Sequence, residues 1–184
     1  MTDKTVFLGR FQPIHKGHKQ VIEDHIDREE NFAVVIGSAG KKREEKNPLS
    51  AEEREKLIKS CFSGLEILEL EDEGQDEEGN QRWLQKLKGL GVDKVISQNS
   101  LVKELVREDE ELELIEQDMY DPEIYSGTEV RRRIRSGEEW RYLVPKCSED
   151  QLEEYLEAIK DSGIQYDFKP GWKRENAYHD TYEK

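Results

Sequence analysis

The chain has 184 residues, a length that fits one domain, because single hydrophobic cores grow to roughly 150–250 residues. Its 43 Asp and Glu residues against 29 Lys and Arg give a formal net charge of -14, which disfavours binding to nucleic acid or to an anionic membrane. The sequence contains neither the run of about 20 apolar residues that a membrane span needs nor a secretory signal pattern, so we expect a cytoplasmic protein.

Strand-like and helix-like segments alternate along the chain. The expected strands are short apolar runs, at residues 5–9, 32–37, 65–70, 94–96 and 112–115. The expected helices are amphipathic or capped segments, at residues 17–26, 50–62, 82–90, 101–106, 126–135 and 148–159. This order predicts an α/β fold, a Rossmann-like doubly wound parallel sheet with helices on both faces, in a single domain. Ligands of such folds bind at the carboxyl ends of the strands.

Within that domain we expect residues 1–147 to form the catalytic part and residues 148–162 a C-terminal helix packed on it. Residues 163–184 are polar with scattered aromatics and read as a tail that can be flexible. The two cysteines, Cys61 and Cys147, are too few for a disulfide framework and have no metal-ligand spacing.

The charge is unevenly distributed, which points to a local anion site. Residues 4–22 hold four bases and no acid, and residues 125–146 hold six bases against three acids, in an otherwise acidic chain. For the second segment, a solvated face of an Arg-rich helix is an equally good interpretation.

The first junction between strand and helix reads Gly9-Arg10-Phe11-Gln12-Pro13-Ile14-His15-Lys16-Gly17-His18. A helix that begins near Gly17 places two imidazoles, His15 and His18, at its N-terminus, where unpaired N–H groups and the positive dipole end favour an anion. Gly17 has no Cβ, so phosphate oxygens could approach the backbone there. Two other interpretations are less favoured. One is a metal pair, for which the pattern lacks a third ligand, and the other is two purely structural histidines.

A second motif, Tyr125-Ser126-Gly127-Thr128-Glu129-Val130-Arg131-Arg132-Arg133, lies more than a hundred residues downstream. The spacing of Ser126 and Glu129 is that of a capping box, which starts a helix. Gly127 leaves space for an approaching oxygen, while Thr128 and Arg131 add a hydroxyl and a forked cation; together these groups describe a polyphosphate clamp. An ordinary capped surface helix is the alternative, and in either case Arg132 and Arg133 can simply face solvent.

The two motifs together resemble the H-x-G-H and I-S-S-T-x-x-R signatures of the nucleotidyltransferase superfamily, in the form of the archaeal-type nicotinamide-nucleotide adenylyltransferases. Smaller matches lie between and after them, at residues 37–39, 47–54, 80–83, 99–102 and 140–146. The resemblance covers about residues 5–146. H-x-G-H alone also resembles pantetheine-phosphate adenylyltransferases, cytidylyltransferases and class I aminoacyl-tRNA synthetases.

The resemblance implies transfer of the adenylyl group of ATP to nicotinamide mononucleotide, with direct in-line attack of the mononucleotide phosphate on the α-phosphorus. It implies the following roles. The catalytic residues would be His15, His18, Arg10 and Arg131. ATP would be bound by Gly9, Arg10, Phe11, His15, Gly17, His18, Ser126, Thr128 and Arg131. The mononucleotide would be bound by Ser38, Asn80 and Trp83, the Trp stacking on the nicotinamide ring.

We expect Mg²⁺ to be held mainly by the ATP phosphates, with no metal-binding residues in the chain, because no carboxylate cluster offers a cage. We expect no nucleic-acid or membrane partner, and the resemblance implies a homo-oligomer, a hexamer. Two other functions stay open: another small adenylyl- or cytidylyltransferase, such as one for pantetheine phosphate, and a module that senses NAD or ATP without turnover.

Overall fold

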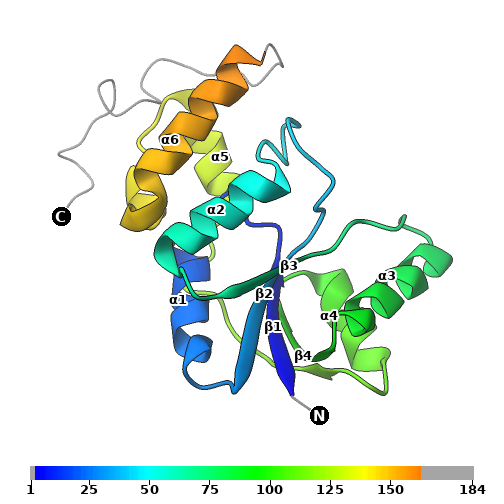
Figure 1. Ribbon diagram of the computed structural model, residues 1–184. Helices are drawn as coiled ribbons and strands as arrows, with labels where there is room; N and C mark the ends of the chain where they lie inside the picture. The colour runs from blue at the N-terminus through cyan, green and yellow to red at the C-terminus, as the bar shows by residue number, and fades with distance from the viewer. Residues whose placement is uncertain (1–2, 163–184) are drawn as a thin grey trace. The chain divides into compact units, whose positions relative to one another are not determined.

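The computed structural model describes residues 3–162, which form two compact units (Figure 1). The first unit comprises residues 3–10, Gln20–Gly40 and Gly64–Met119, and the second comprises Phe11–Lys19, Lys41–Ser63 and residues 120–162. The predicted tail at residues 163–184 lies outside the described residues. Within residues 3–162, no helix has both the length and the apolar character required to cross a membrane.

The first unit contains a five-stranded parallel sheet in the order β3-β2-β1-β4-β5. Its strands are β1 (Lys4–Gly9), β2 (Asn31–Ile36), β3 (Glu66–Glu69), β4 (Val92–Ser97) and β5 (Glu113–Leu114). The central strands are nearly continuous apolar runs because both faces of the sheet are buried. The predicted parallel α/β fold is therefore confirmed, and the strand order reverses between the neighbouring strands β1 and β4.

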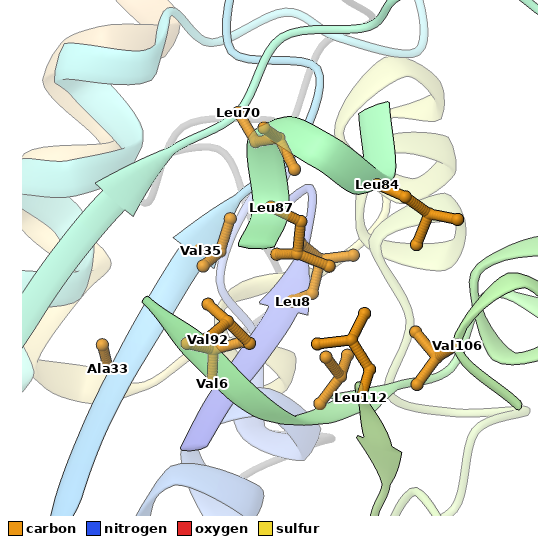
Figure 2. Close-up of a cluster of buried hydrophobic side chains, with 11 residues drawn as sticks. Val6, Leu8, Ala33, Val35, Leu70, Leu84, Leu87, Val92, Val106 and Leu112 are labelled. Atoms are coloured by element: carbon orange, nitrogen blue, oxygen red, sulfur yellow. The ribbon is translucent and has the colours of Figure 1, made fainter. Parts of the chain in front are cut away.

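Helices cover both faces of this sheet. On one face, residues of α3 (Glu77–Gly89) and α4 (Ser100–Glu108) pack on alternate residues of β1 and β2 in one buried cluster (Figure 2). On the other face, the imidazole of His25 in α1 (Lys16–Ile26) stacks on Phe32 of β2, at 6.3 Å between ring centroids. Because side chains alternate between the two faces of a strand, successive residues pack against different helices.

Helix α3 begins earlier than the predicted residue 82. Asp76 caps it by accepting a hydrogen bond from the Gly79 N–H at 2.7 Å, and Glu77 and Glu78 occupy the first turn. The sequence pattern placed these acidic residues outside the expected helix at residues 82–90. Carboxylates, however, also stabilise a helix N-terminus. Asn80 and Trp83 consequently both lie within the helix.

The second unit is helical and contains α2 (Ala51–Cys61), α5 (Gly127–Ser136), the short 3₁₀ turn η1 (Arg141–Leu143) and α6 (Lys146–Asp161). Helix α2, expected at residues 50–62, begins with a capping box: the Ser50 hydroxyl accepts from the Glu53 N–H and the Glu53 carboxylate accepts from the Ser50 N–H. Helix α6 begins at Lys146, before the predicted Ser148, whose hydroxyl donates to the Pro145 carbonyl instead.

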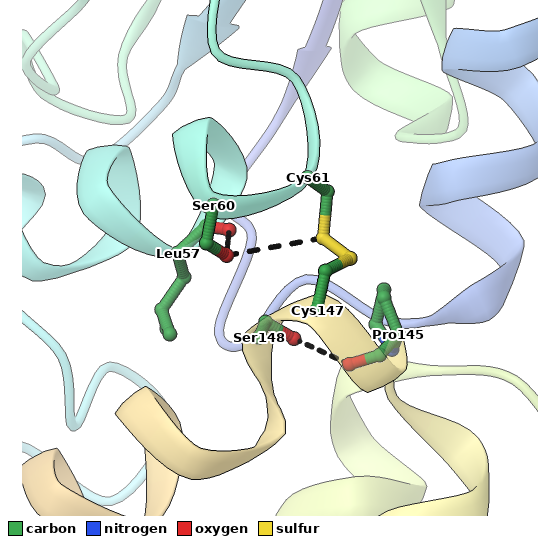
Figure 3. The surroundings of a disulfide bond; sticks show 6 residues. All are labelled: Leu57, Ser60, Cys61, Pro145, Cys147 and Ser148. Carbon is green, nitrogen blue, oxygen red and sulfur yellow. Dashed lines mark hydrogen bonds between the residues drawn. A yellow bond between two sulfur atoms is a disulfide. The ribbon is translucent and has the colours of Figure 1, made fainter.

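A disulfide joins the two helices α2 and α6 (Figure 3). Cys61 is the last residue of α2 and Cys147 lies in the first turn of α6, with 5.4 Å between their Cα atoms. The sequence did not indicate this pairing, because the two cysteines are 86 residues apart. One bridge is not a framework, but both cysteines belong to the second unit and the bridge closes a long loop of the chain.

Removing this bridge is expected to destabilise the fold. Closing a loop of this length restricts the unfolded chain, so the Cys61→Ser/Cys147→Ser variant should lose about 2–5 kcal/mol of unfolding free energy. Urea unfolding checks this, and a reductant should lower the stability of the wild type and leave the double variant unchanged. Two free thiols in the denatured, unreduced wild type would contradict the disulfide.

Candidate active site

His15 and His18 form the N-terminal cap of α1. The Nδ1 atom of His15 accepts hydrogen bonds from the N–H groups of Gly17 at 3.1 Å and of His18 at 3.4 Å. In return, the Nδ1 atom of His18 accepts from the N–H of His15 at 3.1 Å. This is the reciprocal pattern of a capping box, built from two imidazoles in place of a hydroxyl and a carboxylate. The spacing of three residues between the histidines is what the pattern requires.

This cap corrects one expectation from the sequence. The amides of Gly17 and His18 were expected to be open to an anion, but both donate to the His15 ring. The donors that the helix start presents are instead on the imidazoles. A neutral imidazole has one acceptor nitrogen and one N–H, and in both rings the acceptor is Nδ1, so the proton lies on Nε2.

Both imidazoles are neutral at pH 7. Burial of the His15 ring, assisted by the positive charge of Arg131, lowers its pKa to about 3. Burial also lowers the pKa of His18 well below its usual value, and a charge on His15 would lower it further. The rings stack on each other at 3.6 Å between centroids, and Phe11 lies against His18 at 4.5 Å. The site therefore offers two fixed N–H donors that carry no charge of their own.

The lowered pKa of His15 makes stability depend on pH. Between pH 3 and 6.5 the unfolded state binds a proton on His15 that the folded state does not, so the unfolding free energy falls as the pH falls. At pH 4.5 this contribution is roughly 2–3 kcal/mol relative to pH 7. The variant His15→Asn keeps an N-cap acceptor and should lose that part of the dependence.

Urea midpoints of the wild type and of His15→Asn at pH 7 and 4.5 test this. Taking the difference between the two proteins removes the contribution of the many carboxylates, which titrate in both. An identical pH dependence in the two proteins would show that His15 is not buried in its neutral form.

The second motif places Arg131 in the same unit as the histidines. Ser126 caps α5 by accepting from the Glu129 N–H at 3.0 Å. Arg131 is buried; its Nη1 donates to the Gln12 carbonyl at 2.7 Å, and its Nη2 lies 3.4 Å from the Thr128 hydroxyl. A guanidinium one turn into the helix is thus held against the loop that leads to His15.

Two expectations for α5 need correction. Gly127 was expected to leave space for an oxygen, but a Cβ there would lie 2.7 Å from Nη1 of Arg131, so the space is taken by the guanidinium. Arg133 was expected to face solvent, but it is mostly buried, donates to the Glu139 carbonyl at 3.0 Å and lies over the Tyr142 ring. The Glu129 carboxylate pairs with Arg133 and with the exposed Arg132.

The other predicted residues lie in the first unit. Gly9 ends β1, its carbonyl accepts from the Gly37 N–H at 2.8 Å, and the exposed Arg10 follows it. Ser38, which follows β2 in a left-handed conformation with φ of 48°, donates from its hydroxyl to Asp72 at 3.0 Å. Asn80 and Trp83 lie one turn apart on α3, and Trp83 packs in part against the buried cluster of the sheet.

The predicted site residues are thus divided between the two units. The second unit contains Phe11, His15, Gly17, His18, Ser126, Thr128 and Arg131, and the first contains Gly9, Arg10, Ser38, Asn80 and Trp83. Sequence reasoning gave no role to Gln12, although a buried amide side chain between an aromatic residue and Pro13 needs hydrogen-bond partners.

Comparison with known proteins identifies the family. The model of the cytidylyltransferase-like family matches residues 6–133. The nicotinamide-nucleotide adenylyltransferase of Methanolobus tindarius is 36% identical over 154 residues, which cover 82% of this chain and 88% of the relative. That of Halobacterium salinarum is 33% identical over 150 residues, covering 80% and 84%. The chain belongs to the nicotinamide-nucleotide adenylyltransferase family.

Solved structures agree with this family assignment. A bifunctional NMN adenylyltransferase/ADP ribose pyrophosphatase from Francisella tularensis superposes with a TM-score of 0.72 at 25% identity, over 90% of this chain and 52% of that one. The same protein complexed with AMP and a Mn ion gives a TM-score of 0.66. The chain spans about half the length of this bifunctional protein. The predicted membership in the nicotinamide-nucleotide adenylyltransferase family and the predicted fold are both confirmed.

Proposed function

We propose that the chain transfers the adenylyl group of ATP to nicotinamide mononucleotide, producing NAD and pyrophosphate. An oxygen of the mononucleotide phosphate forms a bond to the α-phosphorus, and the bond from that phosphorus to the bridging oxygen of the β-phosphate breaks. The leaving pyrophosphate takes the electron pair, so no residue of the chain acts as a nucleophile. Such transfers depend on positioning and on neutralising charge.

The pair of imidazoles with their protons fixed on Nε2 is the observation that carries this proposal. Two neutral donors suit a phosphoryl group whose negative charge grows in the transition state, because they are oriented before the reaction and need no proton from solvent. We assign His15 and His18 to the α-phosphoryl and bridging oxygens, with His18 donating to the α-phosphoryl group. The low pKa of both rings keeps them from acting as general acids at neutral pH.

Arg131 supplies the positive charge for the β- and γ-phosphates in this scheme, together with Ser126 and Thr128 at the start of α5. Arg10, with Gly9 and Phe11 beside it in the chain, completes the ATP-binding set. Gly17 acts within the helix cap, where its N–H donates a hydrogen bond to the His15 ring. Each group binds or orients, as a direct transfer requires.

The mononucleotide is assigned to Ser38, Asn80 and Trp83 of the first unit. Asn80 and Trp83 lie three positions apart on α3, so an amide and an aromatic ring project from neighbouring parts of one helix face. This combination suits a flat pyridine ring that carries a carboxamide. A pantetheine arm has no such ring to stack.

The divalent cation enters with ATP as part of the substrate, and we propose Mg²⁺. Residues 3–162 hold no group of three or more His, Cys, Asp or Glu side chains that could bind a metal ion. Phosphate oxygens and water are suitable ligands for Mg²⁺, which loses its water reluctantly.

Pyrophosphate release tests the proposal. Purified protein is given MgATP with nicotinamide mononucleotide, nicotinate mononucleotide or pantetheine phosphate, and Arg131→Ala is compared with Arg132→Ala. We expect turnover with a pyridine mononucleotide, a loss of tenfold or more in kcat/KM for ATP in Arg131→Ala, and little change in Arg132→Ala, whose side chain is exposed. Turnover with pantetheine phosphate alone, or ATP binding without any turnover, would overturn the proposal.

A further inference from the structure

Gln12 has an unusually complete set of hydrogen bonds for a residue outside the proposed ATP-binding set. It is 2% exposed, and its side-chain amide faces the main chain of Leu49. The Nε2 group donates to the Leu49 carbonyl at 2.8 Å, and Oε1 accepts from the Leu49 N–H at 2.9 Å. Both ends of the amide are occupied by one residue, so this pair of bonds fixes the plane of the Gln12 side chain.

The main chain of Gln12 contacts the proposed phosphate-binding arginine. Its carbonyl oxygen accepts from Nη1 of Arg131 at 2.7 Å, across a sequence separation of 119 residues. Arg131 is 7% exposed, and Gly127 provides the space in which the guanidinium lies. Because a guanidinium is planar, a short bond at one Nη atom restricts the direction of its other N–H groups.

The two sets of contacts connect three separate segments of the second unit. Leu49 immediately precedes Ser50, the N-cap of α2, so the Gln12 side chain ties its loop to the start of that helix. The Gln12 carbonyl then ties the same loop to α5 through Arg131. His15 lies three residues further along the loop, which places the histidine cap and the arginine on the same support.

We propose that Gln12 is a positioning residue for Arg131: its side chain, locked to Leu49, holds the carbonyl that orients the guanidinium toward the phosphates of ATP. This inference rests on the proposed function, in which Arg131 binds the β- and γ-phosphates. Gln12 itself touches no substrate in this scheme. Its loss should therefore act through Arg131 and should affect ATP more than the mononucleotide.

A double-mutant cycle between Gln12→Met and Arg131→Ala separates this role from a general contribution to folding. Methionine has a similar length and makes neither bond to Leu49. We expect Gln12→Met to lower kcat/KM for MgATP by about tenfold with Arg131 present, and by less than about twofold in the Arg131→Ala background. KM for the mononucleotide should stay within about twofold of the wild type.

Ser148→Ala is the matched control, because it removes another buried hydrogen bond of the second unit, from the Ser148 hydroxyl to the Pro145 carbonyl. Ser148→Ala should have the same small effect on kcat/KM for MgATP with Arg131 present and in the Arg131→Ala variant. If Gln12→Met does not fold, Gln12→Asn replaces it, since its side chain is a neutral amide that is one methylene too short to make both bonds to Leu49. The melting temperature of each variant, read by circular dichroism, shows which variants are folded.

The outcomes distinguish the two proposals. If Gln12→Met lowers kcat/KM for MgATP by the same factor with Arg131 and with Ala at position 131, the positioning role is overturned. The proposed function is then left intact. Wild-type kcat/KM for ATP in Arg131→Ala alone would overturn the phosphate-binding role of Arg131, and the positioning role with it. If Gln12→Met lowers kcat/KM for MgATP less in the Arg131→Ala variant than in the wild type, with an unchanged KM for the mononucleotide, the proposal is supported.

Discussion

Replacing His18 with Asn is expected to lower kcat by about 100-fold or more in a protein that stays folded. The asparagine carboxamide oxygen can accept from the His15 N–H in place of the His18 Nδ1 atom, so the cap of α1 is kept. What is lost is the Nε2 donor, which the proposed mechanism directs at the α-phosphoryl oxygen. Steady-state pyrophosphate release gives kcat, and thermal unfolding reports the state of the helix cap.

Replacement with Gln provides the complementary variant. Its longer side chain carries an N–H near the position of Nε2 but has no acceptor at the position of Nδ1, so it keeps the donor and loses the cap. His18→Gln should therefore be less stable than His18→Asn and yet more active. The reverse order of activity would mean that the cap, and with it the helix start, matters more than the donor.

The two His18 variants test the imidazole cap of α1, which could be predicted from the sequence only in part. The spacing of His15 and His18 correctly placed two imidazoles at the start of a helix. The N–H groups at the helix start were expected to be donors to an anion, because in most helices these groups lack partners. Only the structure shows that Nδ1 of His15 accepts from the N–H groups of Gly17 and His18, and Nδ1 of His18 from that of His15. These bonds determine which ring nitrogen carries the proton.

The strands and most helices could be predicted because their signals are local. Apolar runs closed by glycine mark β1 and β2, and Ser50 with Glu53 marks the start of α2. The early start of α3 was missed because acidic residues favour both loops and the first turn of a helix, and the sequence does not separate the two.

Contacts between distant segments could not be predicted from one sequence. The sequence left Arg133 able to face solvent, and even its contact with the Glu139 carbonyl, six residues further along the chain, appears only in the structure. The bond from Gln12 to Leu49 spans 37 residues, and that to Arg131 spans 119. The disulfide is of the same kind, because no spacing rule relates Cys61 to Cys147.

Adding one methyl group at Gly127 is expected to lower kcat/KM for ATP by about tenfold or more in a protein that still folds. The Ala Cβ would lie 2.7 Å from Nη1 of Arg131, so the guanidinium must move away from the Gln12 carbonyl. A hydrogen bond to a charged group is worth about 1.5–3 kcal/mol, which corresponds to roughly ten- to hundredfold in affinity for the group that it orients.

Stability receives two opposing contributions. Gly127 is the first residue of α5 and has no positive φ, so Ala fits its backbone, and Ala is favoured over Gly in helices by up to about 1 kcal/mol. Against this gain stands the loss of the buried bond from Nη1 of Arg131 to the Gln12 carbonyl, whose oxygen would lie 3.4 Å from the new Cβ. We therefore expect a somewhat lower melting temperature in a folded protein, together with weaker use of ATP.

Gly89→Ala is the matched control for this substitution. Gly89 is the last residue of α3, and a Cβ there would have no heavy atom within 4 Å. This variant should gain up to about 1 kcal/mol of stability from helix propensity and keep the wild-type kcat/KM for ATP. If Gly127→Ala also kept it, Arg131 would tolerate displacement, and the phosphates of ATP could not depend on the orientation that Gln12 and Gly127 give to its guanidinium. Loss of activity in Gly127→Ala alone would show that this glycine is needed for the placement of an arginine, since the backbone conformation at residue 127 is open to Ala.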